Sequence, residues 1–195
     1  MRLSDVDILA KLDTGEIVIH PRPDEECIGS FSIDVRLGRV FQMFRPSQLP
    51  FLDLSDPRGS FAMSENLMET ITVAEGESFF LQPGEFALGI TLERVRLSNA
   101  IVGWLDGRSS LARLGLMVHI TAHAIDPGWD GHITFEFFNA GRFSLALRPG
   151  LRIGALSFEV LSSPTSRPYG SKRGAKYQGQ QSPLSSRISA DHSES

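Results

Sequence analysis

The sequence has little cysteine and no excess of positive charge. Its single cysteine, Cys27, excludes an intrachain disulfide framework and any zinc site that needs two or more thiolates. It carries 19 Lys and Arg residues against 23 Asp and Glu residues, so its formal net charge is −4. A chain with this balance has no global positive field to hold a nucleic-acid backbone. We therefore expect any anionic ligand to be bound by a local cluster of hydrogen-bond donors.

Long hydrophobic runs are also missing. No segment approaches the roughly 18 apolar residues that a membrane span needs. The first residues include Arg2, Asp5 and Asp7, which do not resemble the apolar region of a secretory leader. We expect a soluble, untargeted protein in the reducing cytoplasm, with neither a membrane nor a nucleic acid as its partner.

Turn residues and short apolar runs are plentiful. The chain has 195 residues, of which 18 are Gly and 11 are Pro, and this composition suits one turn-rich globular domain. Alternating or apolar runs predict about a dozen short strands, among them residues 16–20, 31–37, 40–44, 70–73, 78–81, 86–92, 95–97, 144–147 and 152–161. Their regular spacing predicts a mainly β fold, either a sandwich, a jelly roll or a distorted barrel.

Two segments depart from this β pattern near the N-terminus. Ser4 and Asp7 form a capping signal before apolar residues at helical spacing, and Gly15 follows, so residues 4–15 predict a short packing helix. Residues 46–65 mix Pro, Ser, Asp and Gly with isolated apolar residues, which predicts a long surface excursion.

The composition changes sharply after residue 161. Ser, Gln, Gly, Lys and Arg dominate, and such a segment cannot bury enough apolar surface to fold by itself. We divide the chain into a β domain (1–161), a lid that closes over a ligand (162–184) and a disordered tail (185–195). Tyr169, Lys176 and Gln180 give the lid donors suited to phosphates.

A second short helix is expected near the centre of the chain. Ser109 or Ser110 can cap a helix that continues through Leu111, Ala112 and Arg113, and Gly115 closes it. The first turn of a helix offers free backbone N–H groups, and Arg108 and Arg113 add positive charge there. We interpret this segment as an anion site, with a plain capped helix as the alternative.

Glu136 is the most distinctive candidate for catalysis. In residues 132–138 the odd-numbered positions make a core face, and Thr134 and Glu136 share the other face. A strand carboxylate placed among aromatic residues is a candidate general base, although a lone one is more often solvated. The turn that precedes this strand, Asp126-Pro127-Gly128-Trp129, is an ordinary turn sequence whose Asp126 and Trp129 can also line a pocket.

A metal site is a weaker alternative. His119 and His123 are four residues apart and would share one face of a strand, so with His132 and Glu136 they could form a cupin-like metal set. The His-x-His pair expected of cupins is absent, and Ala122 and Ala124 flank His123.

Taken in order, these motifs resemble those of the dCTP deaminase family. The resemblance covers the N-terminal helix, I-D-V-R-L-G at 33–38, G-W-L-D-G-R-S-S-L-A-R-L-G-L at 103–116, T-A-H-A-I-D-P-G-W at 121–129 and the tail from Arg167 to Gln180. It implies a homotrimer with the β-clip fold of dUTPases, one nucleotide at each subunit interface, and hydrolysis of dCTP to dUTP and ammonia in the route to dUMP and dTTP.

The resemblance also implies how the reaction proceeds without zinc. Glu136 would deprotonate the attacking water and shuttle its proton, Ser109 and the carbonyl of Ala122 would place that water, and Arg113 would orient Glu136. The remaining nucleotide contacts fall in four segments of the chain, on Arg108, Ser109, Ser110, Leu111, Ala112, Asp126, Thr134, Phe135, Tyr169, Lys176 and Gln180. Mg²⁺ would arrive on the triphosphate with no metal bound by the protein itself, and His119 would couple the site to inhibition by dTTP.

One position departs from the family pattern. Ala124 lies where related sequences often carry arginine or an aromatic residue. A non-catalytic nucleotide-binding protein is therefore one alternative. A bifunctional enzyme that carries dCTP through to dUMP is another, although the tail lacks the glycine-rich lid of dUTPases.

Overall fold

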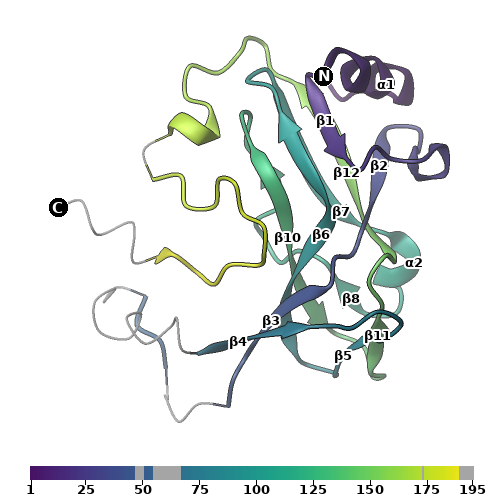
Figure 1. Ribbon diagram of the computed structural model, residues 1–195, viewed down its shortest axis with the longest axis vertical. Helices are drawn as coiled ribbons and strands as arrows, with labels where there is room; N and C mark the ends of the chain where they lie inside the picture. The colour runs from purple at the N-terminus through teal and green to yellow at the C-terminus, as the bar shows by residue number, and fades with distance from the viewer. Residues whose placement is uncertain (47–50, 55–66, 173, 189–195) are drawn as a thin grey trace.

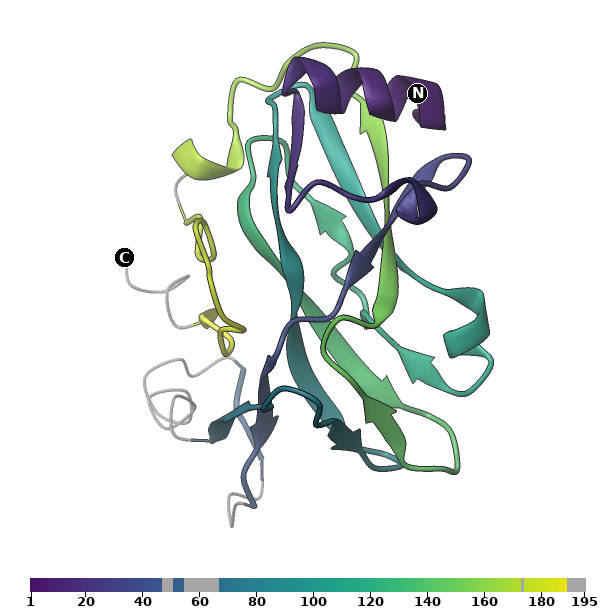
Figure 2. The same ribbon diagram turned by 45° about the vertical axis from the view of Figure 1, so that its right-hand side comes forward.

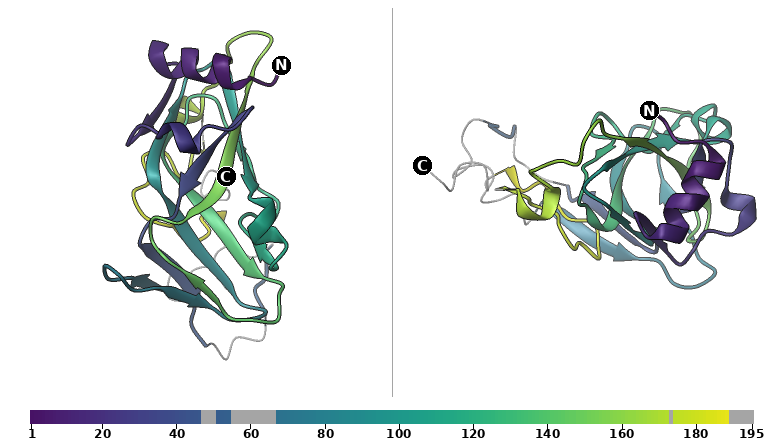
Figure 3. Two further views of the ribbon diagram at one scale, coloured as in Figure 1. Left: turned by 90° about the vertical axis from the view of Figure 1, so that its right-hand side faces the viewer. Right: turned by 90° about the horizontal axis from the view of Figure 1, so that it is seen from above.

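A computed structural model describes residues 1–46, 51–54, 67–172 and 174–188 of the chain. Most of the excursion expected at 46–65 lies outside the described residues. Helix α1 (Asp5–Thr14) covers one end of the β body, as Figure 3 shows. Its N-cap is Ser4, whose side chain and Asp7 form the expected reciprocal capping box, and Gly15 ends it in a left-handed conformation. The predicted N-terminal helix is confirmed.

The strands form three sheets in the described part of the chain. The largest has the order β4 (Met68–Thr72), β3 (Val40–Phe44), β6 (Phe86–Leu97), β10 (Asp130–Asn139) and β8 (Leu116–Met117), and β1 (Ile17–His20) also pairs with β6. A second sheet has the order β2 (Ser32–Arg36), β12 (Arg152–Val160), β7 (Ile101–Gly107) and β9 (Ala124–Ile125). The third pairs β11 (Leu145–Leu147) with β5 (Phe79–Leu81).

The mainly β class is confirmed, with one refinement of the architecture. The described strands do not close into a continuous barrel but remain three separate sheets around a shared core. Within the described residues the helices are α1, the short α2 (Ser109–Ala112) and the 3-10 turns η1 (Glu25–Cys27) and η3 (Tyr169–Ser171). Figure 1 shows α2 at one side of the β body and the C-terminal segment at the other.

The core is rich in phenylalanine. Phe41 stacks on Phe79 with ring centroids 4.3 Å apart, and Phe135 lies 5.2 Å from Phe137. Phe135 and Phe137 are fully buried because odd positions of β10 face inward, as the alternation predicts. The same alternation turns Thr134 and Glu136 to the opposite face of β10.

One strand is longer than the sequence pattern indicates. Residues 86–92 and 95–97 were expected as two strands, but β6 is continuous and includes Glu93. Glu93 is 2% exposed and is paired with Arg36, whose Nε lies 2.6 Å from its carboxylate. This hydrogen bond raises the pKa of Arg36 above its ordinary value. A buried charge with a hydrogen-bonded partner can occupy a strand that an unpaired one would break.

In the described ranges, no helix is long and apolar enough to cross a membrane.

Candidate active site

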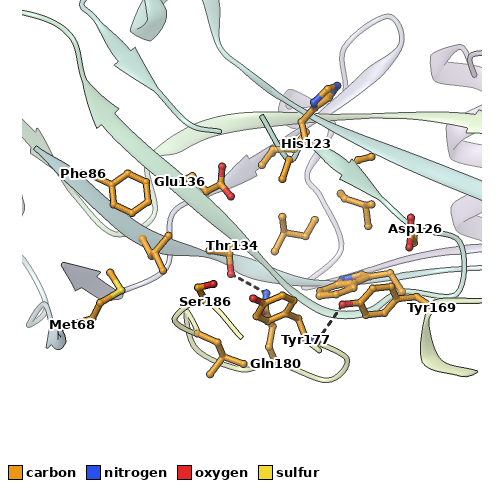
Figure 4. Close-up of a pocket in the computed structure, with 18 of the residues that line it drawn as sticks. Met68, Phe86, His123, Asp126, Thr134, Glu136, Tyr169, Tyr177, Gln180 and Ser186 are labelled. Carbon is orange, nitrogen blue, oxygen red and sulfur yellow. Dashed lines mark hydrogen bonds between the residues drawn. The ribbon is translucent and has the colours of Figure 1, made fainter. Parts of the chain in front are cut away.

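A cavity of about 530 Å³ lies between β10, the segment before β9 and the C-terminal segment. Figure 4 shows Glu136 and Thr134 on β10 directed into this space, with Gln180 and Tyr177 of the tail opposite. The cavity collects six of the residues expected at the nucleotide, which are Ala122, Asp126, Thr134, Glu136, Tyr169 and Gln180. Residues far apart in the sequence therefore meet in one place.

Glu136 is tied to the loop that runs from Val118 to His123. The backbone N–H of Ile120 donates to its Oε2 at 2.9 Å, and its own N–H donates to the carbonyl of Val118 at 3.0 Å. His119 and His123 were expected on one strand, but only β8 and β9 are strand here and the residues between them form this loop. The loop brings Ala122 to the cavity and leaves the second oxygen of Glu136 without a recorded partner in the described chain.

The tail is docked along the exposed edge of the start of β10. The N–H of Gly179 donates to Asp130 at 2.8 Å, and the N–H of His132 donates to the carbonyl of Gln180 at 3.1 Å. The Gln180 side chain, in a residue only 7% exposed, donates from Nε2 to the His132 carbonyl at 2.7 Å and to the Thr134 hydroxyl at 3.0 Å. Backbone pairing of this kind adds a short strand-like segment to the sheet.

Two tyrosines hold the tail over the cavity. The Tyr169 ring packs on Trp129 with centroids 5.2 Å apart, and its hydroxyl accepts from the N–H of Tyr177 at 3.2 Å. The Tyr177 hydroxyl in turn accepts from the N–H of Arg187 at 3.1 Å. Contacts therefore continue past residue 184, the expected end of the lid, and Ser185 also bonds to Gln42 at 3.2 Å. Residues 189–195 of the expected disordered tail lie outside the described residues.

The Asp-Pro-Gly-Trp sequence forms the turn that it predicts. The N–H of Trp129 donates to the carbonyl of Asp126 at 3.1 Å, and Gly128 has a φ of 81°. A side chain at Gly128 would meet Pro168 at 2.5 Å, so this turn is packed directly under the tail. Asp126 lines the cavity, and its carboxylate lies 3.4 Å from Nζ of Lys172.

The other expected site residues lie on α2, away from this cavity. Figures 1 and 2 place α2 and the tail on opposite sides of the β body. None of the residues from Arg108 to Arg113 lines the cavity. Ser109 and Ser110 do not cap the helix, because the N-cap is Arg108 and makes no side-chain capping bond. The N–H groups of Leu111 and Ala112 both donate to the carbonyl of Arg108 at 3.0 Å.

Arg108 and Arg113 have different environments. Arg108 is held by Asp34, whose Oδ2 lies 3.2 Å from its Nη2, and by the carbonyl of Arg152, to which its Nη1 donates at 3.0 Å. Within the described chain, no hydrogen bond or ion pair is recorded for the side chains of Arg113, Ser109 or Ser110, and all three residues are exposed. This half of the expected site faces outward.

Three further expected residues do not line the cavity. Phe135 points into the core and can meet a ligand only through its backbone. Lys176 lies on the tail, where its carbonyl accepts from Arg187 at 2.5 Å. His119 packs on His123 with ring centroids 5.0 Å apart, and His123 packs on Trp104 at 5.4 Å.

The four residues of the metal alternative do not form a metal set. Among the described residues no group of three or more His, Cys, Asp or Glu side chains is placed to hold an ion. The His132 ring instead turns its Nδ1 to the carbonyl of Thr91, 2.9 Å away.

Some residues around the cavity could not be foreseen from the pattern. Phe44, Phe86 and Leu184 line its apolar side, and Tyr177 lies beside Gln180. Tyr177 could have been singled out from the sequence, because it is one of two tyrosines in an otherwise polar tail. The others resemble ordinary core or tail residues in the sequence.

Comparisons with known proteins match nearly the whole chain. A family model described as dCTP deaminase-like matches residues 2–161. The dCTP deaminase of Shewanella oneidensis is 55% identical over 193 residues, which is 98% of this chain and 100% of the relative. The dCTP deaminase of Shewanella amazonensis is equally similar, with 55% identity over 193 residues, 98% of this chain and 100% of the relative.

The solved structure of the 2'-deoxycytidine 5'-triphosphate deaminase from Agrobacterium tumefaciens shares the fold. It aligns with a TM-score of 0.62 at 18% identity, over 82% of this chain and 48% of that chain. Both the family model and the full-length relatives match the stretch that carries Glu136 and the α2 motif. The chain therefore belongs to the dCTP deaminase family.

Proposed function

We propose that the protein hydrolyses dCTP to dUTP and ammonia. The observation that carries this proposal is Glu136, a carboxylate on β10 that lines a cavity together with Ala122, Thr134 and the docked tail. The relatives named dCTP deaminase, alignable over nearly the whole chain, support the choice of substrate.

Glu136 acts as the proton shuttle in this proposal. It takes a proton from a water held by the Ala122 carbonyl as the water oxygen bonds to C4 of cytosine, and the electron pair of the C4–N3 double bond moves to N3. Glu136 returns that proton to N3. It then moves the proton of the added oxygen to the amino group, the C4–N bond breaks and ammonia leaves. One water is consumed for each dUTP and ammonia formed.

The catalytic site is completed by a second copy of the chain. Ser109 and Arg113 are exposed on α2, and the exposed apolar residues Leu114 and Met117 follow it directly in the chain. A polar motif beside exposed apolar residues suits an interface between identical subunits. We assign Ser109, Ser110 and Arg113 to the nucleotide bound in the cavity of a neighbouring copy, in a homotrimer.

The α2 motif and the tail both offer donors for the triphosphate. Arg108, Ser109, Ser110 and Lys176 supply cations and hydroxyls, which are groups that bind phosphate oxygens. Mg²⁺ would be carried by the triphosphate, where it would offset negative charge alongside these residues. Asp126 accepts a hydrogen bond from the deoxyribose hydroxyl. Its contact with Lys172 breaks when the nucleotide binds.

Feedback inhibition by dTTP acts through the loop that carries His119. The N–H of Ile120 holds the Glu136 carboxylate and Ala122 lies two residues further on, so a ligand that moves this loop changes both. We place the reaction in the cytoplasm, a reducing setting that suits the buried free thiol of Cys27.

Product analysis tests the proposal. Purified protein is given dCTP with Mg²⁺, ammonia is followed, and dUTP is separated from dUMP, in parallel with an Ala124→Arg variant. We expect dUTP and ammonia from the parent chain. Formation of pyrophosphate and dUMP would instead indicate the bifunctional enzyme. Turnover by the Ala124→Arg variant alone would indicate that the parent is a nucleotide-binding protein in which Ala124 prevents catalysis.

A further inference from the structure

The Thr134 hydroxyl has its hydrogen-bonding direction fixed by the tail. Gln180 donates from Nε2 to the His132 carbonyl at 2.7 Å and to the Thr134 Oγ1 at 3.0 Å, as the dashed line to Thr134 in Figure 4 shows. A carbonyl can only accept a hydrogen bond, so the group that faces His132 must be the amide nitrogen. Its second hydrogen therefore goes to Thr134, whose oxygen is an acceptor in this pair.

An oxygen that accepts from Gln180 keeps its own hydrogen for another partner. Within the described residues, no acceptor is recorded for the Thr134 hydroxyl hydrogen, and Thr134 lines the cavity beside Glu136. The side chain thus presents a donor, not an acceptor, to whatever occupies the cavity. A chain of hydrogen bonds from Gln180 to Thr134 also makes that donor stronger, because each bond polarises the next.

The backbone around Thr134 supports this arrangement. The pairing of β10 with β6 shifts register between His132 and Thr134, an irregularity of the kind that often re-aims a side chain next to an active site. The N–H of Ile133 bonds to the Thr91 hydroxyl at 2.9 Å, which holds the strand at this point. Thr134 and Glu136 then stand on the same face, one repeat of about 7 Å apart.

We propose that Thr134, oriented by Gln180, donates a hydrogen bond to the 2-carbonyl oxygen of the pyrimidine and stabilises the transition state of deamination. This inference rests on the proposed function, since Glu136 must address C4. The 2-carbonyl and the 4-amino group flank N3 on one edge of the ring, so a hydroxyl donor and a carboxylate spaced along one strand can reach the two ends of that edge.

The chemistry explains why the contact acts on the rate. When oxygen bonds to C4, the electron pair that moves to N3 is shared with the adjacent 2-carbonyl, and negative charge grows on its oxygen. A donor aimed at that oxygen binds the transition state more tightly than the substrate, so it raises kcat more than it lowers KM. The contact thus has a role in addition to recognition of the base.

The test compares Thr134→Val with the conservative Thr134→Ser, using dCTP and its 2-thio analogue, whose sulfur is a weak acceptor. We expect Thr134→Val to lower kcat by about tenfold or more with a smaller change in KM, and Thr134→Ser to stay within about threefold of the parent. In the parent, kcat should fall by a similar factor when the 2-oxygen of the substrate is replaced by sulfur, and we call this fall the sulfur effect. In Thr134→Val the sulfur effect should be small, because the contact with the 2-position is already gone.

Three outcomes would contradict the inference in distinguishable ways. An equal sulfur effect in the parent and in Thr134→Val would show that Thr134 does not touch the 2-carbonyl, even if the variant is slow because the tail docks poorly. An unchanged kcat in Thr134→Val would overturn the role in the transition state. A parent chain that makes no dUTP and ammonia from dCTP would overturn the proposed function and this inference with it.

A Gln180→Leu variant separates orientation from contact. It keeps the Thr134 hydroxyl but removes the donor that fixes its direction, and it also weakens the docking of the tail. We expect a higher KM together with a smaller sulfur effect than in the parent. A sulfur effect as large as that of the parent would show that Gln180 does not orient Thr134.

Discussion

The two halves of the expected site differ in how one chain holds them. Glu136, Thr134 and Gln180 line a cavity and are fixed by hydrogen bonds to the loop and tail of their own chain. Ser109 and Arg113 on α2 are exposed on the opposite side of the β body, where no bond of their side chains is recorded within the described chain. In the proposed assembly, one copy would therefore form the base and water subsite, and α2 of a neighbouring copy would add the phosphate-binding and orienting groups.

The largest effect is expected from the prepared half. Glu136→Gln keeps an oxygen that can accept from Ile120 but cannot take a proton, so we expect kcat to fall by about 10³-fold or more. The control is Glu69→Gln, a carboxylate on β4 that does not line the cavity. Ammonia release from dCTP measures both. Persistent activity in Glu136→Gln would remove this residue from the mechanism.

A smaller but still large effect is expected from the exposed half. Arg113→Ala removes a cation with no recorded role in the fold of the described chain, so we expect kcat to fall by about 10²-fold while the melting temperature barely changes. Arg39→Ala, at an exposed position away from α2, should leave turnover unchanged. A large loss of thermal stability with normal turnover would instead make Arg113 a structural residue.

The tail should contribute mainly to binding. Tyr169→Phe keeps the ring on Trp129 but removes the hydroxyl that accepts from Tyr177, so we expect KM for dCTP to rise about threefold with kcat nearly unchanged. Steady-state kinetics separate the two constants. A fall in kcat alone would place Tyr169 in the chemistry.

The smallest effect is expected at Ala124. Its side chain is exposed on β9 at the edge of the cavity, so we expect Ala124→Arg to change kcat/KM by less than about tenfold. An inactive parent chain and an active Ala124→Arg variant would contradict the view that the parent's residues are sufficient for dCTP turnover.

The local parts of this arrangement were predictable from the sequence. Alternation placed Glu136 and Thr134 on one face of β10, and the capping signal at Ser4 and the Asp-Pro-Gly-Trp turn both formed as predicted. These features depend on neighbours in the sequence, which a periodicity or a turn motif records.

The remaining features depend on distant partners. Residues 86–92 and 95–97 were expected as separate strands, but β6 is continuous, and Arg36 from another strand pairs with the buried Glu93 between them. Ser109 and Ser110 resemble helix caps, yet Arg108 takes that place because β7 runs straight into α2. No local pattern indicates that α2 and Glu136 lie on different sides of the body, or that the tail makes contacts as far as Arg187.

A mixing experiment tests the split site most directly. Glu136→Gln and Arg113→Ala chains, each with at most about a hundredth of parental activity alone, are mixed in equal amounts, unfolded together, refolded and assayed with dCTP. If one copy supplies Glu136 and its neighbour supplies Arg113, random assembly restores about a quarter of the parental activity, because that share of interfaces joins an intact cavity to an intact α2. A mixture no more active than its separate components would contradict the account and place both groups in the site of a single chain.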